Sequence, residues 1–220
     1  MKTASRRHLL KTFAAGAAAV LALPACAASR RALPAMTEGP FYPPDAYRAR
    51  GVDWDADLTA VGGRAADGQP RPRASGEHLD LYGPVLDPEG RIIDNAEVEI
   101  WQCDVHGSYR HPRGAGDRVD DGFQGFGMTK TDASGIYRFR TIRPVPYPGR
   151  APHIHVKLRH PAFGEWVSQL FVAGDPGNAG DNLYRRLSPD ERSFTDITPQ
   201  RAPVGAAVVW LAERSLVVGR

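Results

Sequence analysis

The chain has 220 residues, of which 42% are hydrophobic and 24% are charged, an ordinary composition for one globular domain with appendages. Its formal net charge is +3, but four of its 28 basic residues and none of its 25 acidic residues lie within the first 28 positions. The rest of the chain is therefore close to neutral, which argues against a nucleic-acid partner.

Residues 1–28 are predicted to form a twin-arginine signal peptide. Arg6 and Arg7 precede a short apolar run, which leads into small residues. The apolar run, from Thr12 to Leu23, is shorter than the roughly 20 residues that a membrane-spanning helix needs. An amphipathic first helix is the less favoured alternative, because the segment contains no acidic residue. The pattern predicts export to the periplasm, the medium or the cell surface.

The two cysteines have different expected roles. Cys26 lies in "LPAC", which loosely resembles a lipoprotein cleavage box, so a lipid anchor at Cys26 is the alternative to cleavage at an Ala-x-Ala-like site within residues 25–28. Cys103 is then alone in the domain, and no intrachain disulfide is expected. Because Cys103 lies in an apolar strand pattern, we expect an inert, buried thiol.

Residues 29–76 are predicted to form a loop-rich N-terminal arm. Pro, Gly, Arg and Asp are frequent there, and hydrophobic residues follow neither the period of a strand nor that of a helix. The motif "TEGPFYPP" stands near the front of this arm.

Residues 77–220 are predicted to form the folded domain, an all-β sandwich of the prealbumin-like kind. Strands are expected in "HLDLYGPVLD", "AEVEIWQC", "MTKTDASGIYRFRTI" with a turn at "DASG", "RAPHIHVKLRH" and "EWVSQLFVAGD". One short helix is expected in "SPDERSF", with Ser188 as N-cap, and a closing strand or hairpin in "GAAVVWLAERSLVV". Short strands separated by Gly, Pro and Asp turns are typical of a sandwich.

The sandwich pattern alone does not indicate catalysis. The spacing of Gly, Val, Asp, Ala and Trp between Gly83 and Trp101 also occurs in small sandwich modules that bind or act as spacers. A non-catalytic, secreted binding module is therefore the alternative to an enzyme.

The pair His153 and His155 is the first candidate for chemistry. In a strand, residues i and i+2 lie on one face with their Cα atoms about 6.6 Å apart, so the two imidazoles can bind one metal ion. Ile154, Val156 and Leu158 then face the core. A lone His-x-His pair is a weak signal, and further ligands are needed to support it.

Two tyrosines are candidates for those further ligands. Tyr147 precedes His153 by six residues, in a loop that Pro146 and Pro148 restrict, and Tyr109 follows a predicted strand. Two phenolates and two imidazoles form a hard, anionic ligand set that suits a ferric ion. Because a phenol has a pKa near 10, a trivalent metal is the agent that would deprotonate it at neutral pH.

A different iron site is the alternative within enzymes. His78 and Asp80 form a His-x-Asp pair of the kind found in two-histidine, one-carboxylate sites. Since "HLDLYG" reads as the first strand of the sandwich, we rate this pair below the tyrosines.

Three segments resemble the intradiol ring-cleavage dioxygenases, on the protocatechuate 3,4-dioxygenase side of that family. They are "LYGPVLDPEGRIIDNAEVEIWQCDVHGSYRH", "TDASGIYRFRTIRPVPYPGRAPHIH" and "SQLFVAGDP". By motif, four residues match the family's Fe(III) ligands, namely Tyr109, Tyr147, His153 and His155. Arg150 matches the arginine beside the bound catecholate, and Gln169 matches a polar residue near the substrate and oxygen pocket.

The resemblance also implies a reaction. A small catechol, protocatechuate-like, would bind as a dianion and displace Tyr147, which takes up a proton. O2 would then attack the ring, which opens between its two hydroxyl-bearing carbons to a cis,cis-muconate type diacid containing both oxygen atoms. Arg150 would stabilise charge that develops on the ring. The sequence leaves open which catechol is used, the oligomeric state, and whether the arm completes the site.

Overall fold

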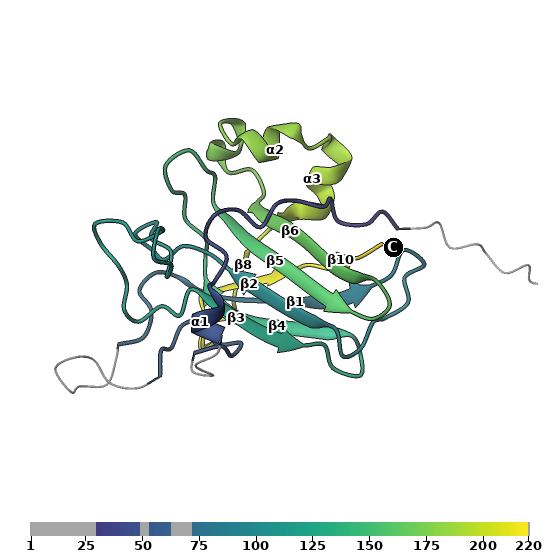
Figure 1. Ribbon diagram of the computed structural model, residues 1–220, viewed down its shortest axis with the longest axis horizontal. Coiled ribbons are helices and arrows are strands. Elements are labelled where there is room, and N and C mark those ends of the chain that lie inside the picture. The colour runs from purple at the N-terminus through teal and green to yellow at the C-terminus, as the bar shows by residue number, and fades with distance from the viewer. Residues whose placement is uncertain (1–29, 49–52, 63–71, 220) are drawn as a thin grey trace, which may run out of the picture.

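The molecule is a two-layered β-sandwich with a few short helices (Figure 1), as predicted. The computed structural model describes residues 30–48, 53–62 and 72–219. The predicted signal peptide, with Cys26, lies outside the described residues. Within the described part of the chain, no helix is both long and apolar enough to cross a membrane.

The strands divide into two sheets. In the first sheet, β1 pairs with three strands, β4, β9 and β10, and β9 also pairs with β8. The strands of this sheet are β1 (His78–Leu86), β4 (Ile136–Ile142), β8 (Gln200–Arg201), β9 (Trp210–Glu213) and β10 (Leu216–Val217). The second has the order β3-β2-β5-β6-β7; its strands are β2 (Glu97–Trp101), β3 (Phe126–Lys130), β5 (His153–His160), β6 (Gly164–Val172) and β7 (Asp196–Ile197).

The C-terminal segment forms two short strands rather than a hairpin. β9 and β10 both run parallel to β1 and pair with successive parts of it, so they do not pair with each other. The link between them crosses close to Gly83, where a Cβ would lie 2.1 Å from the Arg214 carbonyl oxygen. Arg214 N–H donates to the Tyr82 carbonyl, so β1 takes the bonds that a hairpin would have used.

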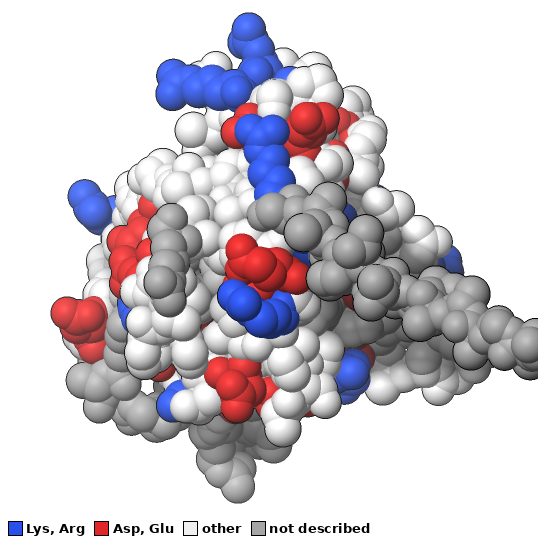
Figure 2. Space-filling model, turned by 90° about the vertical axis from the view of Figure 1, so that its right-hand side faces the viewer, with Lys and Arg blue, Asp and Glu red and all other residues white. Residues whose placement is uncertain are grey.

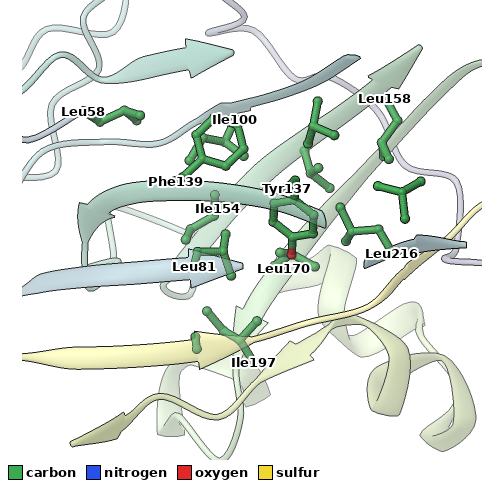
Figure 3. Close-up of a cluster of buried hydrophobic side chains, with 14 of the residues drawn as sticks. Leu58, Leu81, Ile100, Tyr137, Phe139, Ile154, Leu158, Leu170, Ile197 and Leu216 are labelled. Carbon is green, nitrogen blue, oxygen red and sulfur yellow. The ribbon is translucent and has the colours of Figure 1, made fainter. Parts of the chain in front are cut away.

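The inner faces of both sheets form the main core (Figure 3). Ile154, Val156 and Leu158 of β5 belong to it and are almost fully buried, as the alternation of the strand predicted. They pack with Leu81 and Phe139 of the opposite sheet. The odd-numbered residues of β5 therefore lie on the outer face of the second sheet.

Replacing Ile154 with alanine is expected to lower the free energy of unfolding by roughly 2–5 kcal/mol, because it leaves a cavity in a closely packed core. Equilibrium unfolding in urea measures the change. The control is Val204→Ala, since Val204 is fully exposed and its replacement is expected to change stability by less than about 0.5 kcal/mol. Equal effects of the two substitutions would contradict this assignment of the core.

Three short helical segments follow β6 and lie beside it, above the strands in Figure 1: η1 (Pro176–Ala179), α2 (Asn182–Arg186) and α3 (Pro189–Thr195). The predicted helix in "SPDERSF" is confirmed as α3. Ser188 is its N-cap, and a capping box joins Ser188 to Glu191.

In its described parts, residues 30–48, 53–62 and 72–76, the N-terminal arm is irregular apart from the single turn of α1 (Asp45–Arg48). It is nevertheless packed against the sandwich. Leu33 and Leu58 are buried in the main core, and Met36 N–H donates to the Val167 carbonyl at 2.8 Å. The arm thus runs along β6 and across the outer face of the second sheet.

Basic and acidic side chains lie side by side on the end of the molecule shown in Figure 2. Exposed basic side chains also form ion pairs with acidic neighbours; for example, Arg91 pairs with Asp87 and Glu89. Among the described residues of this face, no patch of a single sign dominates.

Candidate metal centre

Two histidines of β5 form the base of the candidate site. His153 and His155 lie on the outer face of the second sheet, and both are buried. Their Nε2 atoms are 3.2 Å apart. Trp101 of β2, directly opposite His155 in the ladder, stacks on its ring with centroids 4.7 Å apart. The predicted His-x-His pair therefore points at one place.

The tautomer of His153 follows from its neighbour. Its Nδ1 lies 2.6 Å from the Ala151 carbonyl oxygen, which can only accept, so Nδ1 carries the proton. The lone pair of Nε2 is then directed at the partner imidazole and at the Tyr109 hydroxyl, which is 3.4 Å away. Two further potential ligand atoms thus lie within hydrogen-bonding distance of His153 Nε2.

Tyr109 comes from the long loop between β2 and β3. It is buried, and its ring lies edge-on to that of Tyr147, with centroids 5.5 Å apart. The loop is held by the buried carboxylate of Asp104, which accepts hydrogen bonds from the N–H groups of His106, Ser108 and Asp120. These three bonds fix the chain just before Tyr109.

Tyr147 comes from the loop between β4 and β5 and is half-buried. Its ring lies 5.6 Å from that of His153. Gly107, with φ of 80°, permits the close approach of the Tyr109 loop, because a Cβ there would lie 3.3 Å from Cβ of Tyr147. The structure therefore brings the four predicted ligand residues together from three segments.

The protonation states of these groups suit a metal ion that supplies positive charge. Burial lowers the pKa of His153 to about 4 and lowers that of His155 well below its usual value, so both imidazoles are neutral. Burial also raises the pKa of both Tyr109 and Tyr147. Two neutral imidazoles are ready ligands, whereas the two phenols need a strongly charged cation to lose their protons.

The spacing of the donor atoms also fits a metal. Two nitrogens bound at about 2.1 Å to one ion lie about 3 Å apart, and the two Nε2 atoms are separated by 3.2 Å. Among the described residues, no three His, Cys, Asp or Glu side chains gather as an alternative ligand cluster. The residues present fit a cation bound by two nitrogens and two phenolate oxygens, and their role as ligands stays a prediction.

Arg150 and Gln169 lie beside the four candidate ligands. Arg150 donates from Nη1 to the Tyr147 hydroxyl at 3.3 Å and from Nη2 to Gln169 Oε1 at 2.5 Å. Gln169 of β6 is the direct cross-strand neighbour of His155. The Arg150 side chain is 17% exposed and forms an ion pair with the fully buried Asp181, so it does not belong to a surface salt bridge.

The arm covers this group of side chains. The ring of Phe41 lies 4.8 Å from that of Tyr109 and 6.2 Å from that of Tyr147. The Thr37 carbonyl accepts a hydrogen bond from Gln169 Nε2, and Gly39 lies beside the His155 ring, where a Cβ would be in ordinary van der Waals contact at 3.5 Å. The arm therefore shields the candidate site from water.

An ion-pair network holds the arm in this place. Lys157, on the same face of β5 as the histidines, pairs with Glu38 of the arm and with Glu165. Its ammonium also lies 4.5 Å from the centre of the Tyr42 ring, and Tyr42 donates a 2.6 Å hydrogen bond to the buried Glu99. The site face and the arm are thus joined by charge as well as by aromatic contacts.

Replacing Lys157 with methionine is expected to loosen the arm, because Glu38 loses its cationic partner. Limited proteolysis should cut the arm several-fold faster. A decrease of about 1 kcal/mol in the free energy of opening the arm raises the population that a protease can cut about fivefold. Lys130→Met is the control, because Lys130 is exposed on β3. Equal cleavage rates in the two variants would contradict the proposed role of Lys157.

Two other predictions concern residues outside the four-residue group. Cys103 is buried, its thiol faces the Val145 carbonyl, and burial raises its pKa to about 12, as expected for an inert thiol. His78 Nε2 lies 2.9 Å from the Ala74 carbonyl, and Asp80 forms an ion pair with Arg140. The alternative iron site at His78 and Asp80 is not supported, because both groups are already partnered on the other sheet.

Three further residues lie at or beside the site and were not expected there from the sequence: Asp181, Asp104 and Trp101. Asp181 and Asp104 are acidic residues in loops, which carry no local signal of a role. The partner of Asp181 is distant in sequence, and those of Asp104 are backbone N–H groups. For Trp101 a signal existed: the alternation of β2 places it on the outer face, where a large aromatic residue needs a partner.

The structure thus defines a class of protein: a β-sandwich in which two histidines on the outer face of one sheet meet two tyrosines from neighbouring loops. A protein-family model described as "Dioxygenase" matches residues 57–189. The protocatechuate 3,4-dioxygenase beta chain of Burkholderia cepacia is 40% identical over 119 residues, which are 50% of this chain and 51% of that one. The alpha chain from the same organism is 30% identical over 186 residues, 80% of this chain and 88% of that one.

Solved structures share the fold. The dioxygenase domain of a dioxygenase carbohydrate-binding protein fusion from Streptomyces sp. SirexAA-E superposes with a TM-score of 0.61 at 24% identity, covering 86% of this chain and 99% of that one. The chain belongs to the intradiol ring-cleavage dioxygenase family. It spans about half the length of the first curated relatives that it matches.

Proposed function

We propose that the protein is a non-haem Fe(III) enzyme that cleaves a small catechol between its two hydroxyl-bearing carbons with O2. The observation that carries the proposal is the convergence of two neutral imidazoles and two phenols beside a fixed arginine. Relatives are named for protocatechuate, hydroxyquinol and catechol, which are all small aromatic diols or triols.

Four side chains would hold the ferric ion, namely Tyr109, Tyr147, His153 and His155. When bound, Fe(III) supplies the Lewis acidity that draws electron density out of a catecholate and opens its ring to O2. A hard, anionic ligand set with two phenolates favours Fe(III) over Fe(II).

The two tyrosines have different expected tasks. Tyr109 is buried, with 3% of its surface exposed, which suits a permanent ligand. Tyr147 is half-exposed, and its oxygen already accepts a hydrogen bond from Arg150. Tyr147 is therefore the phenolate that an incoming catechol would displace, and its oxygen would take up one of the protons that the catechol loses.

Arg150 and Gln169 would act on the substrate. Arg150 stays cationic and lies beside the Tyr147 oxygen, so its guanidinium can stabilise negative charge on a ring bound at that place. Gln169 fixes the far side of the guanidinium through its Oε1 atom. Phe41 and the arm would exclude water from the reacting atoms.

Oxygen uptake with a panel of catechols tests the function. The iron-loaded protein is expected to consume one O2 per catechol and to give a cis,cis-muconate type diacid, identified by its ultraviolet spectrum and mass. Protocatechuate-like compounds are the first choice, on the strength of the matched relatives. Extradiol products, or no uptake with any member of the panel, would contradict the proposal.

The alternative is a non-catalytic β-sandwich binding module. Such a protein would retain its function when both site tyrosines are replaced by phenylalanine, and it would need no metal. The burial of two histidines whose Nε2 atoms lie 3.2 Å apart favours the enzyme. Burying a polar group is costly unless it is hydrogen-bonded, and the buried Nδ1 of His155 has no hydrogen-bond partner among the described residues.

Export by the twin-arginine route is a further part of the proposal. It rests on Arg6, Arg7 and the apolar run that follows them. Fractionation of cells that express the full chain should find the mature protein outside the cytoplasm, whereas Arg6→Lys together with Arg7→Lys should retain it inside. Equal distribution of the two forms would exclude this route, and Cys26→Ser tests the lipid anchor by loss of palmitate labelling.

A further inference from the structure

A buried carboxylate joins the helical end of the molecule to the candidate site. The Asp181 side chain is fully buried between α2 and the loop that carries Arg150. Its Oδ1 accepts hydrogen bonds from the N–H groups of Leu183 and Tyr184, at 2.8 and 3.1 Å, and so caps α2. Its Oδ2 accepts from Arg150 Nε at 2.8 Å and from Ala151 N–H at 2.9 Å. One carboxylate therefore serves both the helix and the site loop.

Asp181 determines how the guanidinium of Arg150 is directed. Each of the three guanidinium nitrogens has an acceptor: Asp181 for Nε, the Tyr147 hydroxyl for Nη1 and Gln169 for Nη2. Of these acceptors, Asp181 is the charged one, and a bond to it is the stronger kind. Because the guanidinium is planar, fixing Nε also fixes the direction of both Nη atoms.

The same carboxylate also fixes the peptide that orients His153. Ala151 donates its N–H to Asp181, and its carbonyl accepts the proton on Nδ1 of His153 at 2.6 Å. A shift of this peptide would therefore change the direction of the His153 ring. Such outer hydrogen bonds commonly set the orientation of an imidazole that binds a metal.

We propose that Asp181 is a positioning residue of the site: it holds the guanidinium of Arg150 against the Tyr147 oxygen and, through Ala151, holds the ring of His153. The effect on turnover rests on the proposed function, whereas the effect on Arg150 does not. If Asp181 served only as the cap of α2, one uncharged side-chain oxygen would be enough. The negative charge is needed only for the bond to Arg150, so removing the charge separates the positioning role from the capping role.

Asp181→Asn tests the charge while keeping the cap, since Asn and Asp are about equally good N-caps. The value of kcat/KM for the cleaved catechol is expected to fall roughly 10- to 100-fold, mainly through kcat, because a hydrogen bond between charged groups is lost. Asp175→Asn is the matched control: Asp175 caps the neighbouring segment η1 and bonds Gly177 N–H. It should change kcat/KM by less than about twofold.

Nitrogen-15 NMR of the metal-free protein provides a second measurement that does not need turnover. The Nε–H signal of Arg150, assigned by its loss in Arg150→Lys, is expected to be sharp and slow to exchange in the wild type and in Asp175→Asn. In Asp181→Asn it should broaden or exchange at the rate of an exposed arginine. This measurement remains valid if no catechol is cleaved and the proposed function fails.

Two results would overturn the positioning role. One is an Arg150 Nε–H signal in the wild type that exchanges as fast as those of exposed arginines. This result can be obtained even if the Asp181 variant does not fold. The other is a folded Asp181→Asn protein with the kcat/KM of Asp175→Asn.

Discussion

Replacing His155 with alanine is expected to abolish stable iron binding and to lower ring cleavage more than about a thousandfold, because a Lewis acid contributes several kcal/mol to the transition state. His155 is buried, and its Nε2 lies 3.2 Å from that of His153. Among the described residues, no three His, Cys, Asp or Glu side chains gather as another ligand cluster. Iron content per protein, measured by mass spectrometry after reconstitution with Fe(III), gives the first readout.

The control is His160→Ala. His160 belongs to the same strand but lies at its end, half-exposed, and bonds the Ala162 N–H. It should keep one iron per chain and near wild-type turnover. Retention of a full iron complement by His155→Ala would mean that the ion is bound elsewhere.

The second large effect is expected from the tyrosines. Iron bound by Tyr109 and Tyr147 should colour the protein through charge transfer from phenolate to Fe(III). Replacing either with phenylalanine should weaken and shift this visible band and lower kcat/KM by at least about a hundredfold, because each change removes one anionic ligand. Absorbance of the reconstituted variants at equal iron content is the measurement.

Tyr137→Phe provides a matched control for this loss of a hydroxyl. Tyr137 lies in the main core and donates to the Arg214 carbonyl at 2.8 Å, on the sheet opposite the candidate site. Its replacement should cost about 1 kcal/mol of stability and leave the colour unchanged. An unaltered visible band in Tyr109→Phe and Tyr147→Phe would exclude both as ligands.

The sequence predicted the elements whose signals are local. The period of two in β5 placed His153 and His155 on one face and Ile154 on the other, because a strand allows no other arrangement. Ser188 as N-cap predicted the start of α3, since the backbone N–H that its side chain caps, that of Glu191, is only three residues away.

The parts that the sequence did not predict depend on contacts between distant segments. Asp181 meets Arg150 from thirty-one positions along the chain, and Glu38 meets Lys157 from still farther away. The parallel pairing of β9 and β10 with β1 likewise depends on a distant contact. Because Gly83 has no Cβ, the Arg214 carbonyl can lie against β1, and no periodicity in the sequence reveals this. Such contacts are set by the packing of the whole sandwich.

The same limit applies to the arm, whose role the sequence alone does not reveal. Residues 29–76 show no periodicity, and the part of the arm around Glu38 and Phe41 is held by contacts of Phe41 with Tyr109 and of Glu38 with Lys157. The aromatic and charged residues of "TEGPFYPP" carry these contacts, but their partners become evident only when the outer face of β5 is known.

The most direct test of the four-residue metal centre is a crystal structure of the iron-loaded protein with data collected on both sides of the iron absorption edge. The anomalous difference map should contain one strong peak per chain, within bonding distance of the Tyr109 and Tyr147 oxygens and of Nε2 of His153 and His155. A peak beside His78 and Asp80, or no peak on the outer face of β5 in crystals that contain iron, would contradict this account.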